Sequence, residues 1–230
     1  MAKLARMLLV VSLVVGFGYP LIWGLGWPAG LTTAWKGAGV GLLALLAAIE
    51  ARNLDGWLLA GLLGCGALGD VLLEGSLIAG AIAFAIGHVV AIWLYLRNRR
   101  ERLSASQRAL ALLIIPACLV IAWSLPSDQG QALGAVVYAL FVAAMAASAW
   151  TSRFPRYLTG IGAMMFLASE LLIFARMGPL AGAAGAGLAI WLLYYAGQLL
   201  IALGVRRVLL SSALTVAAGT FGSVFTNNRA

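Results

Sequence analysis

The sequence predicts an all-α integral membrane protein of about eight transmembrane helices. Hydrophobic residues make up 63% of the 230 residues and charged residues only 10%, and the core of a soluble domain could not enclose so much apolar surface. Apolar segments of roughly 17 to 21 residues recur along the chain, which matches the ~20 residues that a helix needs to cross a bilayer. These segments lack the alternating pattern of a membrane barrel, so strands are not expected.

Eight spans follow one another along the chain, and together they predict a single transmembrane domain over residues 1–210. The first span could be taken for a signal peptide, but it is long and no small-residue cleavage site follows it, so we keep it as a helix. Residues 211–230 form a C-terminal tail. The predicted spans cover approximately residues 7–25, 32–49, 57–73, 77–96, 109–125, 132–150, 157–175 and 187–205.

The distribution of cationic residues predicts the orientation of these spans. Thirteen of the 15 Lys and Arg residues fall at the N-terminus, in the even-numbered loops or after the last span, and only Lys36 and Arg176 fall on the other side. This asymmetry predicts an inner (plasma) membrane protein with both termini in the cytoplasm. It also explains the net charge of +8 better than a nucleic-acid partner does, because the arginines are scattered over short loops. The thirteen are Lys3, Arg6, Arg52, Arg97, Arg99, Arg100, Arg102, Arg108, Arg153, Arg156, Arg206, Arg207 and Arg229.

The two halves of the chain show a weak internal match at an offset of 100 residues. This offset places Asp70 on Glu170 and Leu72 on Leu172. Each half would then hold four spans in the same orientation, which predicts a 4+4 parallel repeat. The alternative is that the match arises by chance between two Leu-rich helices. Even then, the presence of an acid within each helix has to be explained.

Ionisable side chains within predicted spans are the candidates for function, because each of them is costly to place in hydrocarbon. Asp70 and Glu74 lie four residues apart near the end of the third span, and this spacing predicts a shared helical face. His88 lies in the fourth span and Glu170 in the seventh. The alternatives are a solvated loop position for Glu74 and a packing role for His88. Other spans add uncharged polar side chains, namely Tyr138, Tyr194, Tyr195 and Gln198.

Several common chemistries do not fit these residues. The single histidine cannot form a three-histidine zinc site, and Cys65 and Cys118 lack the spacing to replace the missing ligands. The stretch 64–69 matches a dinucleotide-binding fingerprint, but no strand precedes it. We expect its glycines to let a neighbouring helix approach closely beside Asp70. Neither a metal nor a cofactor is therefore expected.

Three short stretches resemble the signatures of the YhhN-like membrane proteins, whose animal members are lysoplasmalogenases. The first runs from Gly66 to Leu73, followed by Gly80, Ala83, Phe84 and His88; the second is 165–170 and the third 194–198. The family usually carries Asp at the end of the second signature, whereas this chain has Glu170. The carboxyl group is therefore retained with one additional methylene.

The resemblance implies hydrolysis of the vinyl ether bond of a lysoplasmalogen, a lipid substrate, without a cofactor. Asp70 and Glu170 would share the roles of general acid and of charge stabiliser or water base, in an order left open. Glu74, His88, Tyr194, Tyr195 and Gln198 would orient water or the head group. Two alternatives are a proton-coupled transporter of a lipid or small solute and a structural or lipid-sensing protein.

Overall fold

The protein is all-α, and eight of its helices are long and apolar enough to span a membrane, as the sequence predicts. The structure is a computed structural model that describes the backbone of residues 2–226 and the side chains of residues 2–212. The helices are α1 (Ala2–Gly18), α2 (Ala29–Glu50), α3 (Leu54–Leu72), α4 (Leu77–Arg97), α5 (Ala105–Ser124), α6 (Gln129–Thr151), α7 (Ile161–Arg176) and α8 (Ala186–Thr226). A 3₁₀ turn, Tyr19–Ile22, extends α1, and a π-helical turn, Arg156–Gly160, leads into α7.

The helix bounds agree with the predicted spans except at the two ends of the chain. The first helix begins at Ala2, earlier than the predicted 7–25. The last helix continues to Thr226 and so enters the predicted tail, because residues 206–226 contain no proline to end a helix. Residues 227–230, which include Arg229, lie outside the described part of the chain. The boundary at residue 210 and the internal repeat stay predictions.

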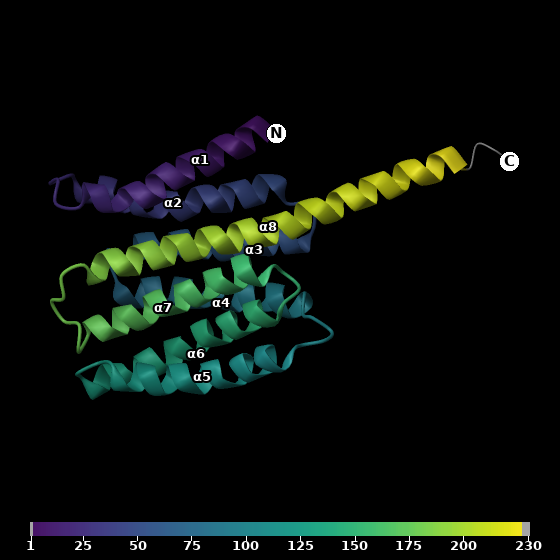
Figure 1. Cartoon of the computed structure of the whole chain (residues 1–230). Helices are drawn as coiled ribbons and strands as arrows, with labels where there is room; N and C mark the ends of the chain where they lie inside the picture. The colour runs from purple at the N-terminus through teal and green to yellow at the C-terminus, as the bar shows by residue number, and fades with distance from the viewer. Residues whose placement is uncertain (1, 227–230) are drawn as a thin grey trace.

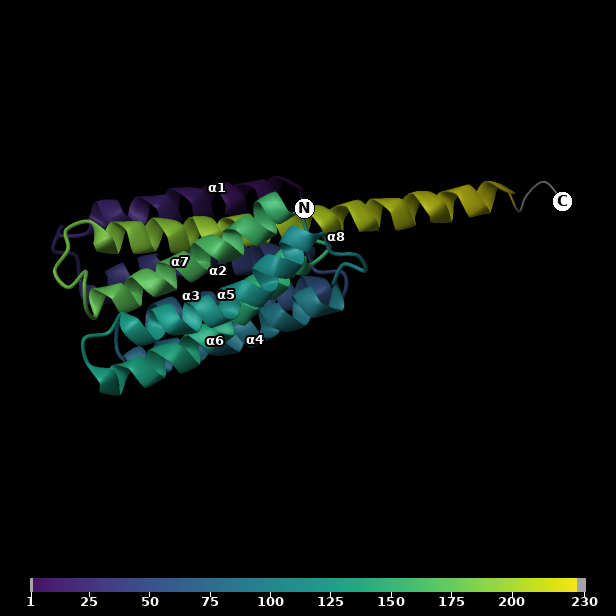
Figure 2. The same ribbon diagram turned by 60° about the horizontal axis from the view of Figure 1, so that its bottom comes forward.

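The helices form one bundle in which α8 holds a central position (Figure 1). It packs against α1, α2, α3 and α7, so it contacts elements from both halves of the chain. On the other side of the bundle, α6 packs against α4, α5 and α7. Figure 2 shows α8 continuing beyond the bundle at the end where the N-terminus lies. Loops 51–53, 98–104 and 152–155, which carry most of the loop arginines, join helices at this same end.

Side-chain caps determine where several helices begin. Asn53, Ser76 and Asp128 each accept a hydrogen bond from a backbone N–H of the first turn that follows. Ser104 and Gln107 form a reciprocal capping box at the start of α5. These caps satisfy N–H groups that have no partner inside the helix, and they allow loops of three to seven residues between neighbouring helices.

Two glycines bring α7 and α8 into backbone contact. A Cβ added at Gly162 would lie 2.6 Å from the carbonyl oxygen of Gly197, and a Cβ added at Gly197 would lie 2.7 Å from the carbonyl oxygen of Gly162. Neither carbonyl can move without disturbing its own helix. In a membrane, small residues of this kind permit the close packing that holds helices together. The contact positions the part of α8 that carries Tyr194 and Gln198.

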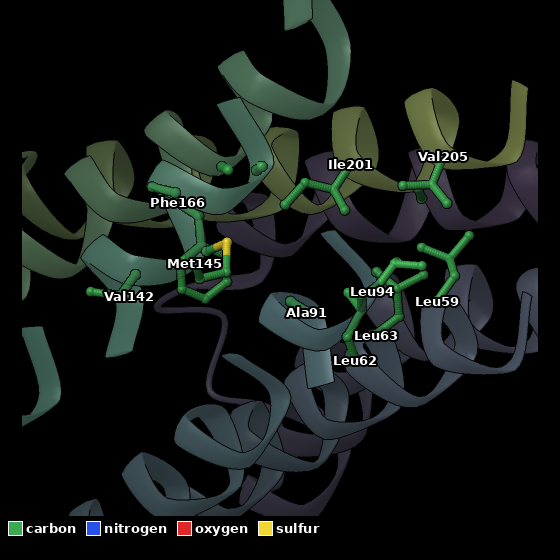
Figure 3. Close-up of a cluster of buried hydrophobic side chains, with 14 of the residues drawn as sticks. Leu59, Leu62, Leu63, Ala91, Leu94, Val142, Met145, Phe166, Ile201 and Val205 are labelled. Atoms are coloured by element: carbon green, nitrogen blue, oxygen red, sulfur yellow. The ribbon is translucent and has the colours of Figure 1, made fainter. Parts of the chain in front are cut away.

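Apolar side chains from five helices fill the interior of the bundle (Figure 3). Leu62 comes from α3, Ala91 from α4, Met145 from α6, Phe166 from α7 and Ile201 from α8. All five are buried. The core therefore joins the two halves of the chain into one packed unit.

We predict that Gly162→Ala and Gly197→Ala each destabilise the protein. The added methyl group cannot be accommodated without separating α7 from α8, and such overpacking costs about 1–3 kcal/mol. Thermal unfolding of the purified protein in detergent should show a lower midpoint for both variants. Gly134→Ala on α6 is the matched control, because a Cβ there meets no atom within 4 Å. Equal midpoints for all three variants would contradict the close α7–α8 contact.

Candidate functional site

Asp70 lies in the last turn of α3, and its carboxyl group is buried inside the bundle. The residue is only 2% exposed. The hydroxyl of Tyr194 on α8 donates a hydrogen bond of 2.7 Å to its Oδ2. A buried carboxyl group needs such a donor, because it cannot be solvated by water. The bond therefore connects α3 to α8 at the point where the chain buries its first acid.

Gln198 extends this contact by one helical turn. It follows Tyr194 by four residues on α8, so the two side chains share a face, and the Gln198 amide interacts with the Tyr194 hydroxyl. A Cβ added at Gly66 on α3 would lie 2.8 Å from Gln198 Nε2 and 3.4 Å from the Tyr194 hydroxyl. A Cβ at Gly69 would lie 2.6 Å from the ring of Phe84. The expected glycine approach beside Asp70 is confirmed at these two positions.

The same does not hold at Gly64, the first glycine of the fingerprint-like stretch. A Cβ there would meet no atom within 4 Å. Of the three glycines in this stretch, only Gly66 and Gly69 therefore mark a close approach of a neighbouring helix.

Glu170 lies in the middle of α7 and is also buried, with 6% of the residue exposed. Its polar neighbour is Tyr138 on α6, whose hydroxyl interacts with the Glu170 side chain. The same hydroxyl lies 3.3 Å from Nε2 of His88 on α4. His88, Tyr138 and Glu170 therefore form a second polar group, built from three helices.

Aromatic rings join the two polar groups. The ring of Phe166 lies 5.2 Å from that of Tyr194 and 5.0 Å from that of His88, measured between centroids. Phe84 packs edge-on against both Phe166 and Tyr194. Asp70 and Glu170 are near enough to interact electrostatically. The structure thus places the two acids in one interior region, each with its own tyrosine and with phenylalanine rings beside them.

Glu74 does not join either polar group. Because α3 ends at Leu72, Glu74 lies in the following turn, which is the loop position stated above as the alternative to a shared helical face with Asp70. The two carboxyl groups still interact electrostatically. The half-exposed carboxylate of Glu74 forms a 2.6 Å ion pair with Lys36 of α2. Lys36 also interacts electrostatically with Asp70. The pair therefore lies at the end of the bundle nearest to Asp70.

Tyr195 also lies apart from the two acids. Its hydroxyl donates a 2.6 Å hydrogen bond to the carbonyl oxygen of Ser12 and lies 2.8 Å from the Ser12 hydroxyl. Its ring fills the space that a side chain at Gly16 would need. Adjacent residues of a helix point about 100° apart, so Tyr195 faces α1 while Tyr194 faces Asp70.

A small cavity adjoins the polar groups. It has a volume of about 20 Å³ and is lined by His88, Gln198 and Tyr95 together with apolar side chains. We did not single out Tyr95 from the sequence, and we gave Tyr138 no role. Tyr95 lies seven residues after His88, two turns along the same face of α4, and this spacing is the signal that could have identified it.

Neither the cavity nor the polar groups form an evident metal centre. Across residues 2–212, no three side chains of His, Cys, Asp or Glu gather closely enough to hold a metal ion. Cys65 is partly buried and Cys118 is buried, and both are free thiols.

Comparison with known proteins yields one match. The model of the YhhN family matches residues 31–205, which is more than half of the chain and includes both acids, His88 and Gln198. No curated protein and no solved structure matches the sequence.

We predict that Tyr194→Phe destabilises the protein, because it removes the hydrogen bond to Asp70 and keeps the ring. Loss of a partner for a buried polar group costs about 1–3 kcal/mol, and interhelical bonds in membranes fall at the lower end of that range. Thermal unfolding in detergent should show a lower midpoint than for Tyr157→Phe, a control whose side chain belongs to a 74% exposed residue. Identical midpoints would mean that the Tyr194–Asp70 bond contributes nothing to the fold.

Proposed function

The chain belongs to the YhhN family, and from this membership and its two buried acids we propose that it is a membrane-embedded lipid hydrolase. The proposed reaction cleaves the vinyl ether bond of lysoplasmalogen-type lysolipids and releases a fatty aldehyde and a glycerophospho head group. The observation that carries the proposal is the burial of Asp70 and Glu170 in one interior region, with Tyr194 bonded to Asp70 and Tyr138 beside Glu170.

Vinyl ether hydrolysis needs a proton donor more than it needs a strong nucleophile. A carboxylic acid transfers its proton to the β carbon of the vinyl group, and the C=C electron pair forms the new C–H bond. The resulting oxocarbenium ion is stabilised by a nearby carboxylate and captured by one water, which loses a proton to that carboxylate. The hemiacetal then collapses to the aldehyde and the free alcohol. Two carboxyl groups with different partners can supply both the acid and the anion.

The interior of the bundle suits this chemistry. Inside an apolar surrounding, an anion stabilises a developing cation more strongly than it would in water. Both acids are buried, as are Phe84 and Phe166, whose rings pack together in the same interior. In the proposal, Asp70 and Glu170 share the two roles, and His88, Tyr194 and Gln198 orient water or substrate. We expected Glu74 and Tyr195 in the same role. In the proposal they support the site indirectly, Glu74 from the turn that follows α3 and Tyr195 through its contact with α1.

The lipid substrate is proposed to enter between helices from the bilayer. The cavity of about 20 Å³ is far smaller than an alkenyl chain, so binding requires apolar side chains beside the acids to move. The cationic end of the bundle is proposed to face the cytoplasm of an inner membrane, which puts the Lys36–Glu74 pair on the opposite side.

We predict that Asp70→Asn and Glu170→Gln each reduce aldehyde release from lysoplasmalogen by about a hundredfold or more, because each removes an acid or base from the reaction. Purified protein in detergent is incubated with the substrate, and the aldehyde is measured. Glu101→Gln, a change at an exposed loop acid, should keep the wild-type rate. Glu170→Asp should retain activity, because it keeps the carboxyl group, although the side chain becomes shorter by one methylene.

Two outcomes would contradict the hydrolase. One is a wild-type protein that releases no more aldehyde than Asp70→Asn does. The other is wild-type activity in both Asp70→Asn and Glu170→Gln. Solute or lipid uptake driven by a pH gradient in proteoliposomes, without aldehyde release, would instead support the proton-coupled carrier.

We further predict that Gly66→Ala lowers the rate of aldehyde release. The added methyl group would lie 2.8 Å from Gln198 Nε2 and would push the end of this side chain away from its position beside Tyr194. A displacement of about 1 Å in such a site can cost up to a hundredfold in rate. Gly64→Ala, two residues earlier on the same helix, is the matched control, since its methyl group meets nothing. Equal rates for the two variants would argue against a role for the Tyr194–Gln198 pair.

A further inference from the structure

Two buried oxygen atoms, from residues that line the small cavity, have no hydrogen-bond partner among the described residues. They are the hydroxyl oxygen of Tyr95 on α4 and Oε1 of Gln198 on α8. Tyr95 is completely buried and Gln198 is 3% exposed. Almost all buried polar atoms in proteins have a partner, either a protein group or an ordered water. Inside a membrane the cost of leaving one unpaired is higher still, because no bulk water can replace the partner.

Both residues line the same small cavity, and His88 lines it too. The remaining wall is apolar and comes from α3, α4, α6, α7 and α8, including Leu62 and Met145 (Figure 3). The volume of about 20 Å³ is room for one water molecule, which needs about 10–15 Å³ on this measure. A cavity of this size with two unpaired oxygens is therefore suited to a single bound water.

The surroundings of Gln198 indicate which of its amide atoms needs that water. The Tyr194 hydroxyl donates its proton to Asp70, so toward the neighbouring Gln198 amide it can act only as an acceptor. Nε2 is the donor of that amide, which leaves Oε1 to accept from another group. A water can donate to Oε1, and the hydroxyl of Tyr95 can donate to or accept from the same water.

The place of Tyr95 on α4 allows its ring to reach this cavity. Long side chains on a helix lean toward its N-terminus, and His88, two turns toward that end of α4, lines the same cavity. The ring also packs edge-on against Phe154, with 6.1 Å between centroids. This contact restrains the ring, and the Tyr95 hydroxyl has no hydrogen-bond partner among the described residues.

We propose that this cavity binds one water between Tyr95 and Gln198, and that Tyr95 is a positioning residue for the water that hydrolysis consumes. The water site stands on the geometry alone, whereas the role of Tyr95 in catalysis rests on the proposed function. The water adds through its oxygen to the oxocarbenium carbon and passes one proton to the carboxylate. Gln198 links this water to Tyr194 and Asp70, so the nucleophile and one acid belong to a single hydrogen-bonded row.

The water site is tested by a structure of the wild-type protein in a lipid nanodisc at a resolution that shows ordered water. We expect one water within hydrogen-bonding distance of both the Tyr95 hydroxyl and Gln198 Oε1, and its loss in Tyr95→Phe. An empty cavity, or direct bonds from both oxygens to protein groups, would overturn the site. This outcome does not depend on any activity.

The positioning role is tested with the steady-state kinetics of Tyr95→Phe on lysoplasmalogen. We expect kcat to fall by about tenfold or more while KM and the thermal unfolding midpoint stay near the wild-type values, because the ring packing is kept and only the water is misplaced. Tyr157→Phe, at an exposed position, should match the wild type. An unchanged kcat in Tyr95→Phe, with an active wild type, would overturn the role of Tyr95 and leave the hydrolase intact. A wild type without activity would contradict the hydrolase and so also the role of Tyr95.

Discussion

Two carboxyl groups lie inside a bundle whose outer surface faces lipid, and the rest of the interior is arranged around them. In such a bundle neither acid can be stabilised by bulk water, so each needs a hydrogen-bond donor from another helix. Asp70 takes its donor from Tyr194 on α8, and Glu170 lies beside Tyr138 of α6. Each acid thereby interacts with a tyrosine of another helix in the interior. The contacts that connect these helices are also the ones that position the acids.

This arrangement depends on where glycine replaces a side chain. Helices in lipid gain little from the hydrophobic effect when they associate, so close packing must hold them together. Gly162 and Gly197 let the backbones of α7 and α8 touch, and Gly66 leaves room for Gln198 beside α3. These contacts hold α8 where Tyr194 reaches Asp70. Packing and polar bonding therefore support the same position of one helix.

The sequence predicted the spans and the buried acids because hydropathy depends only on local composition. The eight-helix fold followed from the length of the apolar segments, and Asp70 and Glu170 stood out as acids within them. The choice between Tyr194 and Tyr195 could not be predicted, because it depends on the rotation of α8 about its own axis. The family resemblance placed both in the same short signature, and only the packing of α1 against Tyr195 separates them.

The position of Glu74 could be narrowed to two alternatives from the sequence, because the predicted third span ends at residue 73, one residue after the observed end of α3. The role of Tyr95 could not be predicted. Tyr95 looked like an ordinary core aromatic, because its unpaired hydroxyl becomes visible only once the cavity between α4 and α8 is known.

The central claim is that a buried carboxylic acid protonates carbon in a vinyl ether. Hydrolysis in D₂O tests it most directly, with the released aldehyde trapped at once and analysed by mass spectrometry. The account predicts one deuterium on the carbon next to the aldehyde group in every product molecule, because the proton added to the β carbon comes from an acid that exchanges with solvent. Aldehyde released without deuterium at this carbon would contradict it.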